Sequence, residues 1–210
     1  IETAQTIVIG PPDKMAEAAY KYRDYPLLKV KLDDQDVVER IRLIREQAPK
    51  PKLMIDANEG WDITLLQEVM PQLLPFNIAL LEQPLPRDKE EQLKGLKRVI
   101  PLCADESCHI SADLDRLHPY YDAVNIKLDK TGGLTEAWAL YEKARAMGFK
   151  IMFGCMVCTS QSIYPALSLA IHADFVDLDG PTWLAQDRDD GLIIRDGKIT
   201  PPQRGIWGGA

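Results

Sequence analysis

Charged residues close five consecutive apolar segments of this 210-residue chain, at intervals of 22 to 26 residues. In chain order the charges are a lysine, three carboxylates and a second lysine: Lys31, Asp56, Glu82, Asp105 and Lys127. Three carboxylates held together without a cation repel one another, and their pKa values rise. Hard oxygen ligands with no histidine or cysteine favour Mg²⁺, with Mn²⁺ as the alternative, over zinc. The spacing therefore predicts a site for one divalent cation flanked by two amines.

Such a site could move a proton next to a carboxylate group. That proton is only weakly acidic, and a bound metal ion can stabilise the enediolate that its removal leaves. A lysine acts as a base only when it is neutral, and a nearby cation or a second lysine lowers its pKa. Two lysines on opposite faces of the substrate could remove the proton from one side and return it on the other. The predicted chemistry is racemisation or epimerisation.

The elements that must position these charges alternate regularly along the chain. Eight short apolar segments predict strands, and seven amphipathic stretches between them predict helices. The expected strands are 6–9, 27–32, 53–56, 78–82, 102–105, 123–127, 150–153 and 175–178. The expected helices are 13–22, 36–47, 63–74, 88–97, 111–117, 135–147 and 160–172. A final segment, 192–199, predicts a hairpin with an Asp-Gly turn.

Apolar strands alternating with helices indicate a parallel sheet that is buried on both faces. Eight such units predict an α/β fold, a modified TIM barrel of the (β/α)7β type, whose C-terminal rim collects the charges. An open doubly wound sheet is the alternative, and it is weakened because no glycine-rich phosphate loop follows the first strand. We expect a catalytic barrel over residues 1–190 and a C-terminal hairpin and tail over residues 191–210.

Composition excludes several classes of protein. Hydrophobic residues make up 46% of the chain, which is enough to form a core, and the formal net charge is −7. The acidic balance argues against nucleic-acid or anionic-membrane partners, and no apolar run is long enough to span a bilayer. Four cysteines indicate a reducing, cytoplasmic location. Cys155 and Cys158 form a C-x-x-C pair, which could be redox-active or half of a zinc site, although ordinary packing is favoured.

Several motifs at these positions carry a resemblance to a known family. They are K-V-K at 29–31, D-A-N at 56–58, E-Q-P at 82–84, A-D-E-S at 104–107, N-I-K-L-D-K-T-G-G-L at 125–134, G-C-M at 154–156 and D-L-D-G-P-T-W-L at 177–184. Over nearly its whole length the chain resembles the enolase superfamily, in its muconate-lactonizing-enzyme subgroup. Within that subgroup it closely resembles the dipeptide epimerases of the L-Ala-D/L-Glu type, which act in murein peptide metabolism.

The resemblance implies a role for each matching residue. Asp56, Glu82 and Asp105 would bind Mg²⁺, and Lys31 and Lys127 would be the two acid/base groups. Lys29 would lower the pKa of Lys31 and contact the substrate carboxylate. Asn58 and Glu106 would support the metal ligands. Asp177 and Asp179 would bind the α-ammonium group of the dipeptide, and Cys155 and Met156 would line the pocket.

The family pattern also includes a part that this sequence does not contain. Family members carry an N-terminal α+β capping domain that closes over the barrel, whereas this chain begins at the first barrel strand. We therefore expect weak or no turnover unless a cap is supplied, in cis or in trans. Related alternatives are o-succinylbenzoate synthase, N-acylamino acid racemase and muconate cycloisomerase; a non-catalytic barrel fragment is the alternative from another class. The sequence leaves open the dipeptide side-chain preference, a homo-oligomeric state and whether the C-terminal tail is native.

Overall fold

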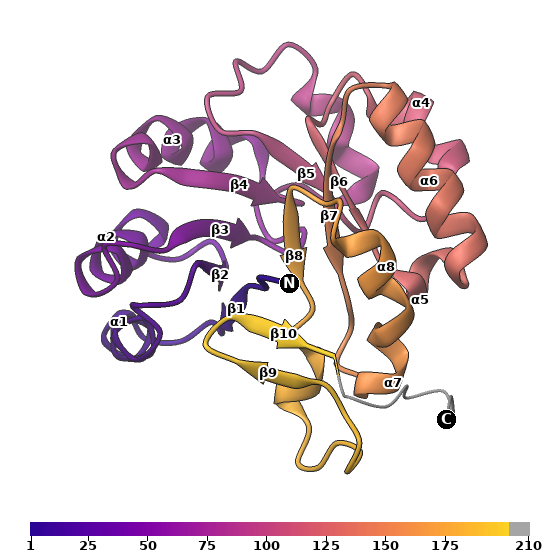
Figure 1. Ribbon diagram of the computed structural model, residues 1–210. Coiled ribbons are helices and arrows are strands. Elements are labelled where there is room, and N and C mark those ends of the chain that lie inside the picture. The colour runs from indigo at the N-terminus through magenta and orange to yellow at the C-terminus, as the bar shows by residue number, and fades with distance from the viewer. Residues whose placement is uncertain (202–210) are drawn as a thin grey trace.

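The computed structural model describes residues 1–201, and its main feature is a sheet of eight parallel strands in sequential order (Figure 1). The strands are β1 (Gln5–Ile7), β2 (Leu27–Lys31), β3 (Lys52–Asp56), β4 (Ile78–Glu82), β5 (Leu102–Ala104), β6 (Ala123–Ile126), β7 (Lys150–Gly154) and β8 (Phe175–Asp177). Helices cover the outside of the sheet, as Figure 1 shows. The predicted (β/α)7β barrel is therefore confirmed.

Five of the seven predicted helices form largely as expected, and two differ. The α-helices are α1 (Pro12–Lys21), α2 (Val37–Gln47), α3 (Ile63–Leu73), α4 (Leu114–Leu117), α5 (Leu128–Thr131), α6 (Leu134–Ala146), α7 (Ser160–Ile163) and α8 (Leu167–Ala170). Short 3-10 helices are η1 (Leu74–Phe76), η2 (Arg87–Leu93), η3 (Ser111–Asp113), η4 (Tyr164–Ala166) and η5 (Gly180–Trp183). None of the helices in the described range is long and apolar enough to cross a membrane.

The two differences have local causes. The α-helix expected over 88–97 is wrong: residues 87–93 form the 3-10 helix η2, after which Lys94 is extended and Gly95 takes a left-handed φ of 76°, so the chain cannot continue as a helix. The helix expected over 160–172 is interrupted by η4, which contains Pro165. Proline has no N–H to donate to the preceding turn and its ring crowds that turn, so it disfavours a regular α-helix at this point.

The barrel closes between its first and last strands, with help from a C-terminal hairpin. Across this seam the Ala4 N–H donates to the Val176 carbonyl at 2.8 Å, and the Leu178 N–H donates to Thr3 Oγ1 at 2.9 Å. The antiparallel hairpin, β9 (Ile193–Arg195) and β10 (Lys198–Thr200), confirms the expected Asp-Gly turn. Its Ile199 N–H donates to the carbonyl of residue 1 at 2.8 Å, so the hairpin ties down the N-terminus. The part of the expected tail over 202–210 lies outside the described residues.

Two-residue periodicity builds the interior of the barrel in layers. An apolar layer, buried except for the partly buried Phe175, takes one residue from each strand or its start: Ala4, Leu27, Met54, Leu80, Cys103, Ala123, Met152 and Phe175. Side chains two residues further along a strand point to the same face. Adding two to each number gives a layer that is mostly polar and charged: Thr6, Lys29, Asp56, Glu82, Asp105, Asn125, Gly154 and Asp177. The apolar layer is therefore the floor on which the candidate site rests.

Candidate active site

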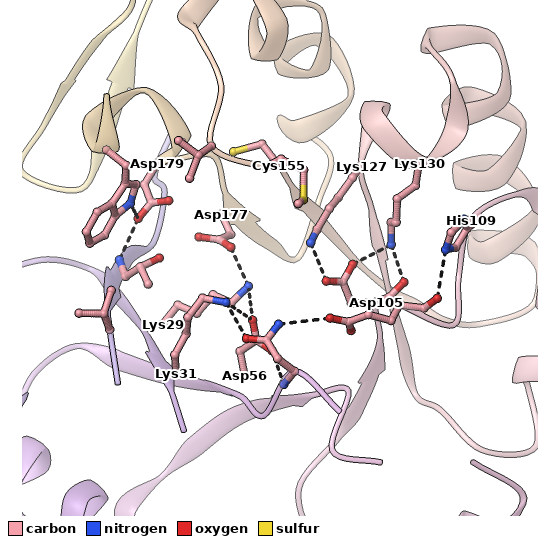
Figure 2. A pocket seen from close by; sticks show the side chains of 18 residues that line it. Lys29, Lys31, Asp56, Asp105, His109, Lys127, Lys130, Cys155, Asp177 and Asp179 are labelled. Carbon is pink, nitrogen blue, oxygen red and sulfur yellow. Dashed lines mark hydrogen bonds and ion pairs between the residues drawn. The ribbon is translucent and has the colours of Figure 1, made fainter. Parts of the chain in front are cut away.

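A cavity of about 690 Å³ opens at the C-terminal ends of the strands (Figure 2). This volume lies within the range of roughly 300–1,000 Å³ that is common for small-molecule sites. Among the predicted site residues, those that line it are Lys29, Lys31, Asp56, Asn58, Asp105, Glu106, Lys127, Cys155, Met156, Asp177 and Asp179. Glu82 is fully buried below the cavity. The structure thus brings every predicted site residue to the cavity or directly beneath it.

Lys29 is the centre of the buried charge cluster. Its Nζ lies 3.0 Å from Asp56 Oδ2, 2.8 Å from Glu82 Oε2 and 2.9 Å from Asp177 Oδ2. Burial lowers the pKa of this lysine, but the three carboxylates outweigh burial and hold the pKa well above its usual value. Lys29 is therefore a permanent cation here, and its three contacts all go to protein carboxylates. The expected contact with a substrate carboxylate remains a prediction.

Of the three predicted metal ligands, Glu82 is the carboxylate whose negative charge is balanced by the fewest neighbouring groups. The Asn125 side-chain amide donates to its Oε1 at 2.7 Å, whereas Oε2 accepts no directed hydrogen bond and has only the Lys29 ammonium nearby. Burial, followed by repulsion from Asp56, raises the pKa of Glu82 to about 8. A buried acid with this pKa marks a place where one more positive charge would be stabilising.

Asp105 has the opposite electrostatic balance. Lys127 donates to its Oδ2 at 2.5 Å, and Lys130 donates to its Oδ1 at 2.7 Å. Burial alone would raise the pKa of Asp105, but these two ammonium groups lower it well below its usual value. In return, Asp105 and Glu82 outweigh burial at Lys127 and raise its pKa. A lysine acts as a base only when its pKa is lowered. For Lys127, this would require additional positive charge near Asp105 and Glu82.

The two proposed acid/base lysines face the cavity from opposite sides. Lys31 ends β2 and Lys127 follows β6, and these strands are four positions apart in the ring of eight. Figure 2 shows their ammonium groups approaching from different sides, with Asp56 between them. Lys31 is the more accessible, with 34% of its side chain exposed, and it donates to Asn58 Oδ1 at 2.7 Å. A planar carbon between the two amines would present a different face to each.

Asp177 and Asp179 occupy different environments, although one residue separates them. Asp177 pairs with Lys29 through Oδ2, and its buried Oδ1 has no hydrogen-bond partner. Asp179 Oδ2 accepts the Thr6 N–H at 2.9 Å and the Trp183 indole N–H at 3.1 Å. Burial and the charge of Asp177 raise the pKa of Asp179. The two aspartates therefore form an acidic corner of the cavity in which at least one carboxylate oxygen, Asp177 Oδ1, is free to accept a hydrogen bond.

The comparisons with known proteins agree with this geometry. A model of the enolase C-terminal domain-like family matches residues 13–206. The chain belongs to this family. A racemase of N-acetyl-D-glutamate from Pseudoalteromonas sp is 48% identical over 99% of this chain and 66% of its own length. The L-Ala-D/L-Glu epimerase of Escherichia coli (strain K12) is also 48% identical, over 94% of this chain and 62% of its own length.

A solved member of the enolase family adds a ligand to the comparison. The dipeptide epimerase of Cytophaga hutchinsonii, in complex with Mg and the dipeptide D-Ala-L-Val, superimposes with a TM-score of 0.89 at 32% identity. The match covers 96% of this chain and 59% of that one. This chain thus spans between about three-fifths and two-thirds of these relatives, and the three relatives are isomerases of amino acid derivatives.

The donor set of this enolase-family barrel suits a divalent cation such as Mg²⁺. Asp56, Glu82 and Asp105 supply carboxylate oxygens from neighbouring strands, and Glu82 Oε2 is buried without a directed hydrogen bond. Within residues 1–201, however, no three acidic, histidine or cysteine side chains converge on one point as they stand. The reason is that the oxygens turn toward lysines, Asp56 toward Lys29 and Asp105 toward Lys127. Metal binding would replace these ion pairs.

Three polar residues of the site were not singled out from the sequence. Lys130 binds Asp105, Asn125 binds Glu82, and the Gln83 side-chain oxygen accepts the Asp105 N–H at 2.9 Å. Asn125 was detectable, because it lies two residues beyond the floor residue Ala123 and so points inward. Gln83 follows β4 in irregular backbone and Lys130 lies on the single helical turn α5, where strand periodicity gives no signal.

The implied supporting roles of Asn58 and Glu106 are consistent with their contacts. Asn58 donates through its backbone N–H to Asp56 Oδ1 at 3.0 Å and through its side-chain amide to Glu106 Oε1 at 3.2 Å. Burial, followed by repulsion from Asp105, raises the pKa of Glu106. These contacts link the ends of β3 and β5 across the rim of the cavity.

Proposed function

We propose that this chain is the catalytic barrel of a Mg²⁺-dependent dipeptide epimerase of the L-Ala-D/L-Glu type. The observation that carries the proposal is the placement of Lys31 and Lys127 on opposite sides of one cavity that also contains a carboxylate cluster. Two amines on opposite sides suit exchange of a proton between the two faces of one carbon. A single base, or two on one side, would exchange the proton without inverting the carbon.

The two lysines would exchange roles with the direction of the reaction. One neutral lysine removes the proton from the α-carbon of the C-terminal residue, and the other, as an ammonium, donates a proton to the opposite face. Lys31 has Asn58 and Asp56 as hydrogen-bond acceptors, while Lys127 has Asp105. These partners hold each ammonium in place while it is charged.

A divalent cation held by Asp56, Glu82 and Asp105 would supply the positive charge that makes the proton next to a carboxylate more acidic. Mn²⁺ has the same preference for oxygen ligands and is the alternative to Mg²⁺. Lys29, a buried cation in the wall of the cavity, adds a second positive charge on the side of β2. Asn125 fixes one carboxylate oxygen of Glu82 by donating a hydrogen bond to Oε1.

Asp177 and Asp179 would bind the free α-ammonium of the dipeptide. The buried, unpartnered Oδ1 of Asp177 supports this assignment, because an orphaned carboxylate oxygen is stabilised by an incoming cation. The second candidate function is racemisation of an N-acylamino acid. It is favoured by the 48% identity to an N-acetyl-D-glutamate racemase and by the partners that Asp177 and Asp179 already have within the protein.

An apolar rim around the cavity supports the need for a cap. Val8, Met156, Val157 and Trp183 all line the cavity, and each is between 43% and 65% exposed. Exposed apolar side chains grouped at a cavity mouth mark a surface that another element covers. We propose that an α+β capping domain, in cis or in trans, covers this rim and excludes water. The setting that we propose is murein peptide metabolism in the cytoplasm.

The decisive test follows the α-proton in deuterated water. The chain is incubated with Mg²⁺ and L-Ala-L-Glu, alone and with an added cap domain, and both deuterium incorporation and the D-epimer are measured. We expect slow exchange by the chain alone and faster epimerisation with the cap. No exchange under either condition would refute the proposal and would favour a non-catalytic barrel.

The Asp179→Asn variant separates the two candidate functions. For an epimerase of dipeptides, it should raise KM for L-Ala-L-Glu while leaving N-acetyl-glutamate turnover unchanged, because only the dipeptide carries an ammonium. Asp115→Asn, on the exposed surface of α4, is the matched control. If dipeptide turnover is unaffected by Asp179→Asn, the N-acylamino acid racemase becomes the better assignment.

A further inference from the structure

Lys130 is the fourth lysine that lines the cavity, and all three N–H groups of its ammonium are used in hydrogen bonds within the protein. Its Nζ donates to the Asp105 carbonyl at 2.6 Å, to Asp105 Oδ1 at 2.7 Å and to the Asn125 carbonyl at 2.8 Å. An ammonium has three N–H donors and no acceptor, so these three bonds use all of them. Only 13% of the Lys130 side chain is exposed. Lys130 therefore has no donor left for a substrate.

Lys127 differs in this respect, although only three residues separate the two lysines. Lys127 has one hydrogen-bond acceptor, Asp105 Oδ2, so two of its three N–H groups remain for other partners. The two lysines thus divide the Asp105 carboxylate between them, one oxygen each. Removing Lys127 from Oδ2 would leave the contacts of Lys130 with Oδ1 and with the two carbonyls intact.

We propose that Lys130 is a positioning residue for Asp105, which it holds by three fixed bonds while Oδ2 exchanges Lys127 for the cation. The inference rests on the proposed function, since it presumes that Asp105 is a metal ligand. Two of the bonds go to backbone carbonyls, one just beyond the end of β5 and one in β6, so the same ammonium ties two neighbouring strand ends together. Lys130 restricts both the carboxylate and the backbone that carries it.

The local backbone explains how a lysine reaches this position. α5 is a single turn, and Gly132 follows it with a φ of 75°, a left-handed conformation that side chains with a Cβ rarely adopt. The turn folds the chain back over the end of β6, and Lys130 lies on it three residues after Lys127. Because no other ammonium contacts Oδ1 or these two carbonyls, the arrangement depends on one side chain among the described residues.

Calorimetric titration of the chain with Mg²⁺ alone tests the proposal without substrate. We expect Lys130→Met to weaken Mg²⁺ binding by about 10- to 100-fold, the usual cost of losing a residue that orients a metal ligand. Lys143→Met is the matched control, because Lys143 also donates to a carbonyl and a carboxylate, Ser111 and Asp115, but lies outside the site. It should leave Mg²⁺ affinity unchanged.

The sign of the change separates positioning from simple charge. If Lys130 acted only through its positive charge, its removal would strengthen Mg²⁺ binding, and either stronger or unchanged binding would overturn the proposal. Lys130→Arg keeps the charge but cannot place one nitrogen among three acceptors, so this variant should also bind Mg²⁺ more weakly. Wild-type Mg²⁺ affinity in Lys130→Arg would overturn the proposal, even if Lys130→Met does not fold. If the unaltered chain binds no Mg²⁺, the proposed function fails instead.

Discussion

The substitution Glu82→Gln should stabilise the metal-free protein at high pH while removing a metal ligand. Glu82 is fully buried, and its pKa rises from 4.5 to about 8 because of burial and the neighbouring carboxylates. Its folded-state pKa therefore exceeds its unfolded value. Protonated Glu82 contributes full stability below pH 4.5, and this contribution is lost as the pH rises through about 8.

The size of the effect follows from the same shift. One pKa unit corresponds to ~1.36 kcal/mol, so ionising Glu82 in the folded protein costs on the order of 5 kcal/mol above pH 8. Glutamine resembles the protonated acid, and its oxygen can still accept the hydrogen bond from Asn125. We therefore expect the variant to gain about 3–5 kcal/mol in free energy of unfolding at pH 9, and about zero near pH 4.

Urea unfolding at pH 4, 7 and 9 without divalent cations measures this difference directly. Added Mg²⁺ should raise the stability of the wild-type chain and have little effect on Glu82→Gln, since ligands stabilise only the state that binds them. Glu39→Gln, on the exposed face of α2, is the control and should show no such gain at high pH. If Glu82→Gln is less stable than the wild-type chain at pH 9, the proposed shortage of positive charge around Glu82 is wrong.

Further predictions concern the acid/base pair, the packing under the site and the thiols. Lys31→Ala and Lys127→Ala should each abolish epimerisation, and each should leave deuterium exchange with only one stereoisomer; exchange with both would contradict the two-sided geometry. Gly154→Ala should cost about 1–3 kcal/mol in urea unfolding, because its Cβ would lie 2.7 Å from a buried amide oxygen. Iodoacetamide should label Cys158 long before Cys108. The pKa of Cys158 is lowered by its hydrogen-bonded neighbour Cys155, whereas burial raises the pKa of Cys108 to about 12. Mass spectrometry of digests measures the order of labelling, and the reverse order would contradict this prediction.

The strand order and the location of the site were predictable because two simple periods coincide. Apolar runs of similar length recur once per β/α unit, and a charge closes five consecutive runs, so Asp56 and Glu82 had to meet at one end of the barrel. The register confirms this, since Lys31, Asp56 and Glu82 pair directly across β2, β3 and β4. Side-chain alternation then directs them inward.

The partners of each charge were not predictable in the same way. Spacing along the chain places Lys29 near the carboxylates but does not say that it contacts three of them, which depends on side-chain torsions and on burial. Lys130 was missed because it lies on a single helical turn after β6, where neither period applies. The α-helix expected over 88–97 was wrong although most residues there are good helix formers, because the chain winds as the 3-10 helix η2 and leaves helical geometry at Lys94, before Gly95.

The seam between β8 and β1 has a consequence for synthesis on the ribosome. Within the barrel, the segment that leads into β1 can bond to β8 only after β8 has been made, since the Val176 carbonyl accepts the Ala4 N–H, and the hairpin bond from Ile199 to residue 1 forms later still. Until then the nascent chain presents a curved sheet with two unpaired edges, which are templates for association with other chains. The interval of greatest aggregation risk therefore comes late in the synthesis of the barrel, and Asp177 and Asp179 are added in the same step that ends it.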